Sequence, residues 1–294
     1  SSTASVLASQ AQARSAPILV RYGDRTVATF PVHVVVTPQD SLRYARATES
    51  QPARILYLEQ ALRLNPADAQ VRKTLGGIYL RSGRTEEAVR QFGEAVRLNP
   101  GDPQALAELM KAEMTRKDYA AVIETGHRLL KLTPADASVY AHMAFASGQS
   151  GRWPQAISWY RKSLEIDPNQ TMISFKLGEA YEMTNNAPAA MEAYRSVLKR
   201  VPNADHALVA LAGVSLKAGK NDEAIKAYRE LVKRQPRNAL LYANLAVAYG
   251  NKGMTREEIE YGRKALAPDP SHAVARFPYT AAYESLSTAR DTAR

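Results

Sequence analysis

The chain has 294 residues, of which 45% are hydrophobic and 23% are charged, with a net charge of +10 and no cysteine. This length allows one to three domains with buried cores, and the lack of cysteine excludes disulfides, thiolate metal sites and a cysteine nucleophile. No apolar run approaches the roughly 20 residues of a transmembrane helix, so we expect no membrane span in this chain.

The positive charge is spread along the chain. Consecutive blocks of 68 residues each carry a net charge of only +2 or +3. A protein that follows a phosphate backbone concentrates its Lys and Arg side chains on one stripe. We therefore expect no nucleic-acid partner.

The N-terminal residues have a composition of their own. Residues 1–17 are predicted to be a flexible leader, and residues 18–37 a small β-hairpin segment. In the latter, Ile18–Tyr22 and Thr26–Phe30 are rich in β-branched and aromatic residues and flank a Gly-Asp turn. An isolated hairpin is marginal in water. These strands are therefore expected to pack on the first repeat described below, on a second copy of the chain as a homo-oligomer, or on a domain upstream.

From residue 66 onward the chain repeats with a period of 34 residues. Seven prolines mark this period without insertion or deletion, at positions 66, 100, 134, 168, 202, 236 and 270. Such a period is typical of helical repeat proteins. With the proline as position 32 of each repeat, six full repeats follow one another: 69–102, 103–136, 137–170, 171–204, 205–238 and 239–272.

Each repeat is predicted to be a helix-turn-helix. Small residues at position 8, in the first helix, and at position 20, in the second, let the two backbones approach, and an aromatic side chain at position 24 fills the adjoining space. The best example combines Gly76, Ala88 and Phe92. The turn has Gly or Asn at position 15, because these residues tolerate the left-handed conformation that ends a helix. Asp68, Asp102 and Asp136 are expected to cap first helices, and Pro154 and Pro188 to begin second helices.

This pattern resembles the tetratricopeptide repeat (TPR) family over residues 69–272. The residues that carry the resemblance in the best repeat are Leu75, Gly76, Tyr79, Ala88, Phe92, Ala95 and Pro100. The resemblance implies an all-α fold, a right-handed superhelical solenoid of stacked helix pairs with a groove lined by the first helices. Residues 38–68 are expected to be a partial first repeat that keeps only its second half, and residues 273–294 a C-terminal capping helix.

Two repeats depart from the pattern. The repeat at 103–136 has Lys117 in place of the turn glycine and Gly126 in place of the aromatic residue, so we expect it to be the loosest. The repeat at 239–272 has Glu258 at the small position and Gly262 at the aromatic one, as terminal repeats are often atypical. Thr255 and Glu258 match a capping box.

No chemical motif stands out. The five histidines form no pair at i, i+4 with an acid, and no phosphate-binding loop or nucleophile elbow occurs. We therefore predict no catalytic residues, no metal, no cofactor and no enzyme activity.

The resemblance implies that ligands touch positions 2, 5, 6, 9, 12 and 13 of the first helices. TPR proteins that hold acidic chaperone tails have Lys at position 5 and Asn at position 9, but here the only basic position 5 is Lys73, with Gly77 at position 9. This carboxylate clamp is absent. The asparagine ladder of the glycosyltransferase-type repeats is absent as well.

The middle of the groove is predicted to be apolar, with a polar rim. Phe145, Met172 and Phe175 would anchor a partner, because exposed aromatic and Met side chains are enriched in the cores of interfaces. The expected rim residues are Lys111, His142, Lys176 and Glu179. Alternatively, the apolar residues pack against neighbouring first helices or the N-terminal segment.

The predicted function is that of a protein-interaction scaffold that binds a partner peptide or helix in this groove, within a bacterial envelope assembly. The alternative is a targeting or regulatory module of a larger enzyme whose catalytic domain lies outside this chain. The compartment, periplasm or cytoplasm, stays open.

Overall fold

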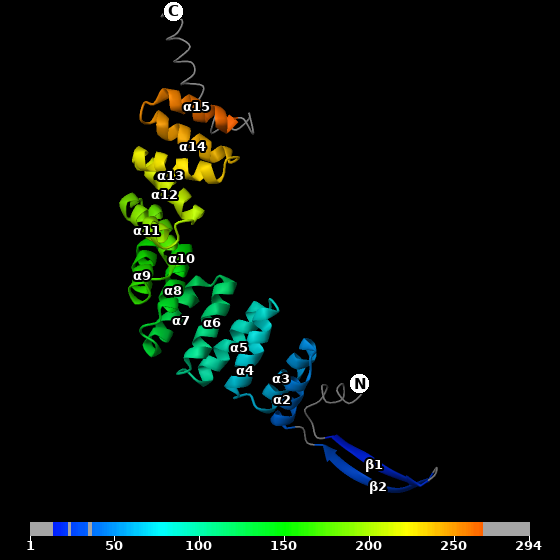
Figure 1. Cartoon of the computed structure of the whole chain (residues 1–294). Coiled ribbons are helices and arrows are strands. Elements are labelled where there is room, and N and C mark those ends of the chain that lie inside the picture. The colour runs from blue at the N-terminus through cyan, green and yellow to red at the C-terminus, as the bar shows by residue number, and fades with distance from the viewer. Residues whose placement is uncertain (1–13, 23–24, 35–36, 267–294) are drawn as a thin grey trace, which may run out of the picture. The chain divides into compact units, whose positions relative to one another are not determined.

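The computed structural model describes residues 14–22, 25–34 and 37–266, with side chains for residues 37–266. Helices occupy almost all of residues 37–266 and succeed one another in antiparallel pairs (Figure 1). The all-α prediction is thereby confirmed. The expected capping helix at 273–294, the last residues of the repeat at 239–272, and residues 1–13 of the expected leader lie outside the described residues.

A two-stranded hairpin precedes the helices. β1 spans Arg14–Tyr22 and β2 spans Arg25–Val34. The strands pair antiparallel, from Arg14 opposite Val34 to Tyr22 opposite Arg25, with one irregularity after Val20. Residues 14–17 of the expected leader are thus part of β1.

The chain divides into two compact units, of which the first comprises residues 1–134. Its helices form three successive pairs: α2 (Pro38–Ala47) with α3 (Gln51–Leu64), α4 (Ala69–Arg81) with α5 (Thr85–Leu98), and α6 (Pro103–Arg116) with α7 (Tyr119–Leu132). Residues 38–68 therefore contain a helix in each half. The first of them, α2, is a short helix whose sequence does not show the repeat pattern.

The second unit comprises residues 135–294. Its pairs are α8 (Ala137–Gln149) with α9 (Trp153–Ile166), α10 (Thr171–Met183) with α11 (Ala187–Arg200), α12 (Asp205–Lys217) with α13 (Asn221–Arg234), and α14 (Ala239–Gly250) with α15 (Thr255–Leu266). Within each unit, every helix packs on the next one in the chain. Among the described residues, no helix combines the length and the apolar character that crossing a membrane requires.

Close approach within a pair depends on a small residue that faces an aromatic ring. A Cβ atom at Gly76 would lie 3.0 Å from Cε1 of Phe92, and one at Gly178 would lie 2.5 Å from Cε1 of Tyr194. Real Cβ contacts are essentially never as short as 2.5 Å and rarely as short as 3.0 Å, so in both pairs the ring occupies space that a side chain would need. The prediction for positions 8 and 24 is confirmed in these two repeats.

The turn between the helices of a pair has one residue in the left-handed conformation in all six repeats. Four of these residues are glycines; the other two are Lys117, with φ of 63°, and Asn185, with φ of 56°. Lys117 therefore makes the same turn as the glycines, although its Cβ is crowded there. The predicted caps are also confirmed: the side chains of Asp68, Asp102 and Asp136 accept hydrogen bonds from the first turns of α4, α6 and α8.

The two atypical repeats exchange large and small residues between positions. In the repeat at 103–136, Met110 of α6 is buried at the small position and Gly126 of α7 at the aromatic one. In the last repeat, a Cβ at Gly250 would lie 2.8 Å from Cδ of Glu258, so this glycine provides the room for that side chain. The capping box predicted from Thr255 is wrong, because α15 already begins at Thr255 and the amide of Glu258 donates to the carbonyl of Met254.

One carboxyl group is buried between α6 and α7. The side chain of Glu113 is 6% exposed, and its Oε2 has no hydrogen-bond partner. Burial raises the pKa of Glu113 to about 7, although a hydrogen bond with Thr125 opposes the rise. The raised pKa means that the folded chain keeps a proton on this carboxyl that the unfolded chain loses at a lower pH.

We predict that Lys117→Gly stabilises the protein by about 0.5–1 kcal/mol, because glycine relieves the left-handed strain and loses only part of this gain to the greater freedom of the unfolded chain. Urea unfolding monitored by circular dichroism measures the change. Lys117→Ala is the control, since it removes the same charge but keeps the Cβ atom, and it should give no gain. Equal stability of the Gly and Ala variants would contradict the argument.

A second prediction concerns pH. Because the folded-state pKa of Glu113 lies above the unfolded value, the wild-type free energy of unfolding should fall as the pH rises from about 5 to 8, by about 2 kcal/mol from this residue. Glu113→Gln should remove this pH-dependent loss, so the free energy of unfolding of the variant should rise relative to that of the wild type as the pH rises. The test compares urea unfolding of both proteins at the two pH values. A constant difference between them would show that Glu113 does not titrate in this range.

Candidate partner-binding site

A pocket of about 310 Å³ lies in the second unit between the first helices α8 and α10. Its walls come from three helices that follow one another in the chain. The lining residues are Phe145, Gly148 and Gln149 of α8, Trp153 and Tyr160 of α9, and Lys176, Glu179, Glu182 and Met183 of α10. Those of α8 and α10 are positions 6, 9, 12 and 13 of their repeats, which we call the groove positions together with positions 2 and 5.

Helix geometry explains how these side chains meet. Lys176, Glu179 and Glu182 are spaced three residues apart, so they lie on one face of α10. Tyr160 is buried at the aromatic position of α9 and forms the floor. Trp153, the first residue of α9, fits closely under α8, because a Cβ at Gly148 would lie 2.9 Å from Cζ3 of its indole.

The charges of the pocket are partly paired. Nζ of Lys176 lies 2.7 Å from Oε2 of Glu179. Oε1 of Glu182 accepts a 2.5 Å hydrogen bond from the hydroxyl of Tyr194, and its Oε2 lies 3.9 Å from Nζ of Lys217. Burial raises the pKa of Tyr160, and the charge of Glu179 adds to the effect; burial and the bond to Glu182 do the same for Tyr194. Both phenols therefore stay protonated and can act as hydrogen-bond donors.

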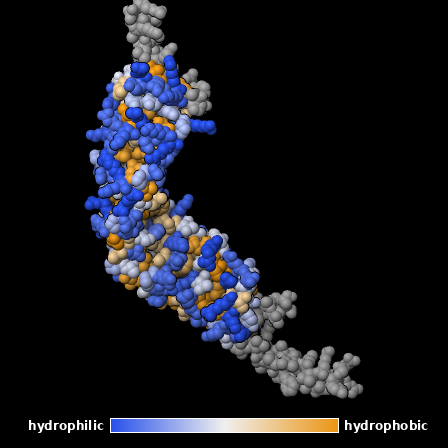
Figure 2. All heavy atoms as spheres, in the orientation of Figure 1, coloured by the Kyte–Doolittle hydropathy of each residue, from blue (hydrophilic) through white to orange (hydrophobic). Residues whose placement is uncertain are grey.

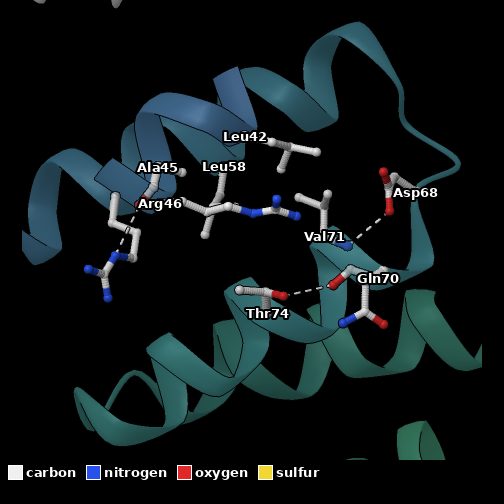
Figure 3. A pocket seen from close by; sticks show the side chains of 9 residues that line it. Leu42, Ala45, Arg46, Leu58, Asp68, Gln70, Val71 and Thr74 are labelled. Carbon is white, nitrogen blue, oxygen red and sulfur yellow. Dashed lines mark hydrogen bonds between the residues drawn. The ribbon is translucent and has the colours of Figure 1, made fainter. Parts of the chain in front are cut away.

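Two pockets in the described part of the first unit lie at comparable places. The larger, of about 430 Å³, lies where side chains of α2, α3 and α4 converge, among them Leu42, Leu58 and Val71 (Figure 3). Its polar groups serve the fold: the guanidinium of Arg54 donates to two carbonyls at the end of α2, and Asp68 caps α4. Arg54 and Asp68 are therefore occupied by contacts within the fold. The remaining polar side chains of this larger pocket are those of Arg46, Gln70 and Thr74.

The other pocket of the first unit, of about 300 Å³, contains Lys73. Nζ of Lys73 lies 2.7 Å from Oδ2 of Asp102, and both side chains are only 16% exposed. The lysine lowers the pKa of Asp102, which also caps α6. The charge of Lys73 is therefore neutralised within the chain. Within the described residues, no group of three or more His, Asp or Glu side chains is placed to hold a metal ion.

Family models described as tetratricopeptide repeat or TPR repeat match residues 43–107, 78–137, 148–185, 174–204 and 209–273. The chain belongs to the tetratricopeptide repeat family. No curated protein matches it in sequence.

Solved TPR structures share the fold at low sequence identity. The C-terminal part of a TPR repeat-containing protein from Cytophaga hutchinsonii is 14% identical with a TM-score of 0.66, and covers 82% of this chain and 98% of its own. A tetratricopeptide repeat protein from Parabacteroides merdae is 15% identical with a TM-score of 0.53, covering 83% and 96%. MamA from Desulfovibrio magneticus is 20% identical with a TM-score of 0.50, covering 57% and 94%. At these identities the likeness concerns the fold.

The predicted TPR groove residues have different environments. The structure brings together Phe145, Lys176 and Glu179 in the pocket of the second unit. Phe175 is half-buried instead: its ring lies 5.3 Å from that of Tyr194 and 4.8 Å from that of His206, as the packing alternative requires.

The remaining predicted groove residues do not line this pocket. Met172 is 60% exposed at the start of α10. His142 bonds within its own helix, with Nδ1 2.7 Å from the carbonyl oxygen of Ser138. Lys111 is exposed on α6, which belongs to the first unit, whereas the pocket belongs to the second.

Sequence reasoning missed six of the lining residues. Gly148, Gln149, Glu182 and Met183 are at positions 12 and 13, which the family pattern includes, so reading those columns would have found them. The other two are the aromatic residues Trp153 and Tyr160. The aromatic pair could not be found in this way, because Tyr160 matches a core position and Trp153 a helix start. Their contribution to a pocket follows from the packing of α9 beneath α8 and α10.

We predict that this TPR protein does not bind the acidic tail peptides of chaperones, because Lys73 lacks the Asn partner and is paired with Asp102. Fluorescence anisotropy with a labelled acidic tail peptide should show no binding at micromolar concentration. Asp102→Asn is the informative comparison: it frees the lysine without supplying an Asn at position 9, so it too should fail to bind tightly. Micromolar, salt-sensitive binding by the wild type would overturn the prediction.

Proposed function

We propose that this chain is a non-catalytic scaffold that binds a segment of a partner protein along the groove positions of its second unit. TPR repeats are typically interaction modules rather than catalytic domains. The proposal adds a location and a chemistry to that general role. Its main support is the distribution of exposed apolar side chains.

Among residues 135–266 of the second unit, four of the six exposed large apolar side chains are at groove positions. Met172, Met183, Val209 and Leu240 are between 40% and 60% exposed, at positions 2, 5 or 13 of α10, α12 and α14. Figure 2 shows apolar residues in separate patches between hydrophilic ones on the visible face. Exposed apolar residues that gather on one face favour an interaction site, since scattered ones need no explanation. Two of the four are Met, whose flexible side chain adapts to a partner.

The pocket supplies the polar part of this surface. The Lys176–Glu179 pair lies on α10 between the apolar residues Met172 and Met183. Its contact distance is 2.7 Å, and both side chains are partly exposed. A partly exposed pair of this kind contributes little to folding stability but can orient a ligand that replaces one partner. The groove positions of the second unit thus combine apolar contact area with polar groups that give specificity.

The test exploits the exposure of the two methionines. Met172→Gln with Met183→Gln keeps the side-chain size, should leave the melting temperature nearly unchanged, and should weaken partner binding by about tenfold or more, because each buried Met contributes about 1–2 kcal/mol. Partners are captured from lysate of the source cells with the wild type and then titrated against both proteins.

The matched control is Ile166→Gln with Val201→Gln, which changes two apolar residues of the same unit, 40% and 43% exposed, outside the groove positions. This control should bind the partner as the wild type does. Equal losses in both double variants, or none in either, would refute the groove proposal.

A further inference from the structure

The pocket between α8 and α10 has a composition that the apolar groove around it lacks. Phe145, Trp153 and Tyr160 present three aromatic rings, and Glu179 and Glu182 present two carboxylates. The faces of aromatic rings and carboxylate oxygens both attract cations. An apolar side chain would gain from the rings alone and would cover the carboxylates without pairing them.

The charge of the pocket is negative once internal pairs are subtracted. Lys176 pairs with Glu179 at 2.7 Å, so these two residues nearly cancel. Glu182 is left with a hydrogen bond from a neutral phenol, that of Tyr194, and a 3.9 Å contact to Lys217, whose side chain is 80% exposed. A pair this long and this exposed is weak. Oε2 of Glu182 is therefore the acceptor that an incoming cation can use.

We propose that this pocket binds one arginine side chain of the partner segment. The inference rests on the proposed function, since it concerns one residue of the same ligand. A planar guanidinium can stack on an aromatic ring while its N–H groups donate to a carboxylate, which a lysine ammonium cannot do in the same geometry. The volume of about 310 Å³ is at the lower end for a ligand site and fits one side chain better than a cofactor.

Lys176 has a defined part in this arrangement. Its ammonium group occupies Glu179 and repels a second cation in the pocket, so it weakens the binding of arginine. Loss of the Lys176 charge should therefore strengthen the binding of arginine, although Lys176 lines the pocket. Lys176→Met should tighten the arginine complex severalfold, because it frees the second carboxylate and keeps the aliphatic stem. A variant that merely disturbed the pocket would weaken binding.

The assay uses the fluorescence of Trp153 in the full chain. Trp159→Phe leaves Trp153 as the only tryptophan, because the chain has two. N-acetyl-arginine amide is the probe, and N-acetyl-citrulline amide, which has the same shape without the charge, and N-acetyl-leucine amide are its comparisons. We expect saturable millimolar binding of the arginine probe, at least tenfold weaker binding of the other two, and a loss of affinity with added salt.

Glu182→Gln should weaken the arginine complex about tenfold, since the isosteric amide removes the charge. The matched control is Glu192→Gln on α11. The Glu192 carboxylate lies 3.3 Å from Arg195, and Glu192 lines a different pocket. It should leave binding unchanged. Melting temperatures of all variants check that the fold is intact.

Equal binding of arginine and citrulline probes, or an unchanged affinity in Glu182→Gln, would overturn the proposal. Preference for the leucine probe would do the same and would show an apolar anchor instead. Any of these three results leaves the proposed function standing if the two methionine substitutions still weaken binding of the captured partner. Loss of that effect, with arginine binding intact, would refute the groove proposal and show that the pocket serves another ligand.

Discussion

The contact between a small residue of the first helix and an aromatic ring of the second is the constraint on which the typical helix pairs depend. At Gly178 the ring of Tyr194 lies where a Cβ would be, 2.5 Å away, and Gly76 faces Phe92 in the same manner. This contact fixes how near the two backbones lie, and the left-handed residue in the turn fixes how the chain returns. Because every helix within a unit packs on the next one of that unit, an error in one pair would displace the pairs that follow in the same unit.

The same aromatic position connects the core to the surface. Tyr160 is 4% exposed and belongs to the core of its pair, yet its ring also forms the floor of the pocket between α8 and α10. In the next layer Tyr194 is covered by Phe175, and its hydroxyl instead reaches Glu182 of the pocket. The aromatic residue that closes the pair of α8 and α9 is therefore also part of the pocket wall. The first helices α8 and α10 contribute the side chains at positions 6, 9, 12 and 13, and these determine the charge and polarity of the pocket.

Atypical repeats keep this architecture through paired changes. The repeat at 103–136 has Met110 where the other repeats have a small residue and Gly126 where four of them have an aromatic ring, so the larger side chain moves from one site to the other. Glu258 at the small position of the last repeat is matched by Gly250. Lys117 carries some strain in its turn but does not alter it. Among the described residues, no such compensating change accompanies the buried Glu113 of the repeat at 103–136, whose Oε2 has no hydrogen-bond partner.

The sequence by itself determined the repeat, the helix pairs from residue 69 onward, the aspartate caps and the left-handed turns at Gly and Asn, because all of these depend on contacts within 34 residues and on backbone preferences of single residue types. It did not show α2 or the left-handed turn at Lys117. It also located Phe145, Lys176 and Glu179 at one surface, since helical spacing dictates which side chains share a face. Only the tertiary structure decided that Phe175 packs on Tyr194 and His206, that Trp153 and Tyr160 line the pocket, and that Asp102 takes the charge of Lys73. The reason is that all of these except the Phe175–Tyr194 contact, which lies within one pair, join successive helix pairs, whose relative placement is set by packing rather than by the periodicity of either repeat.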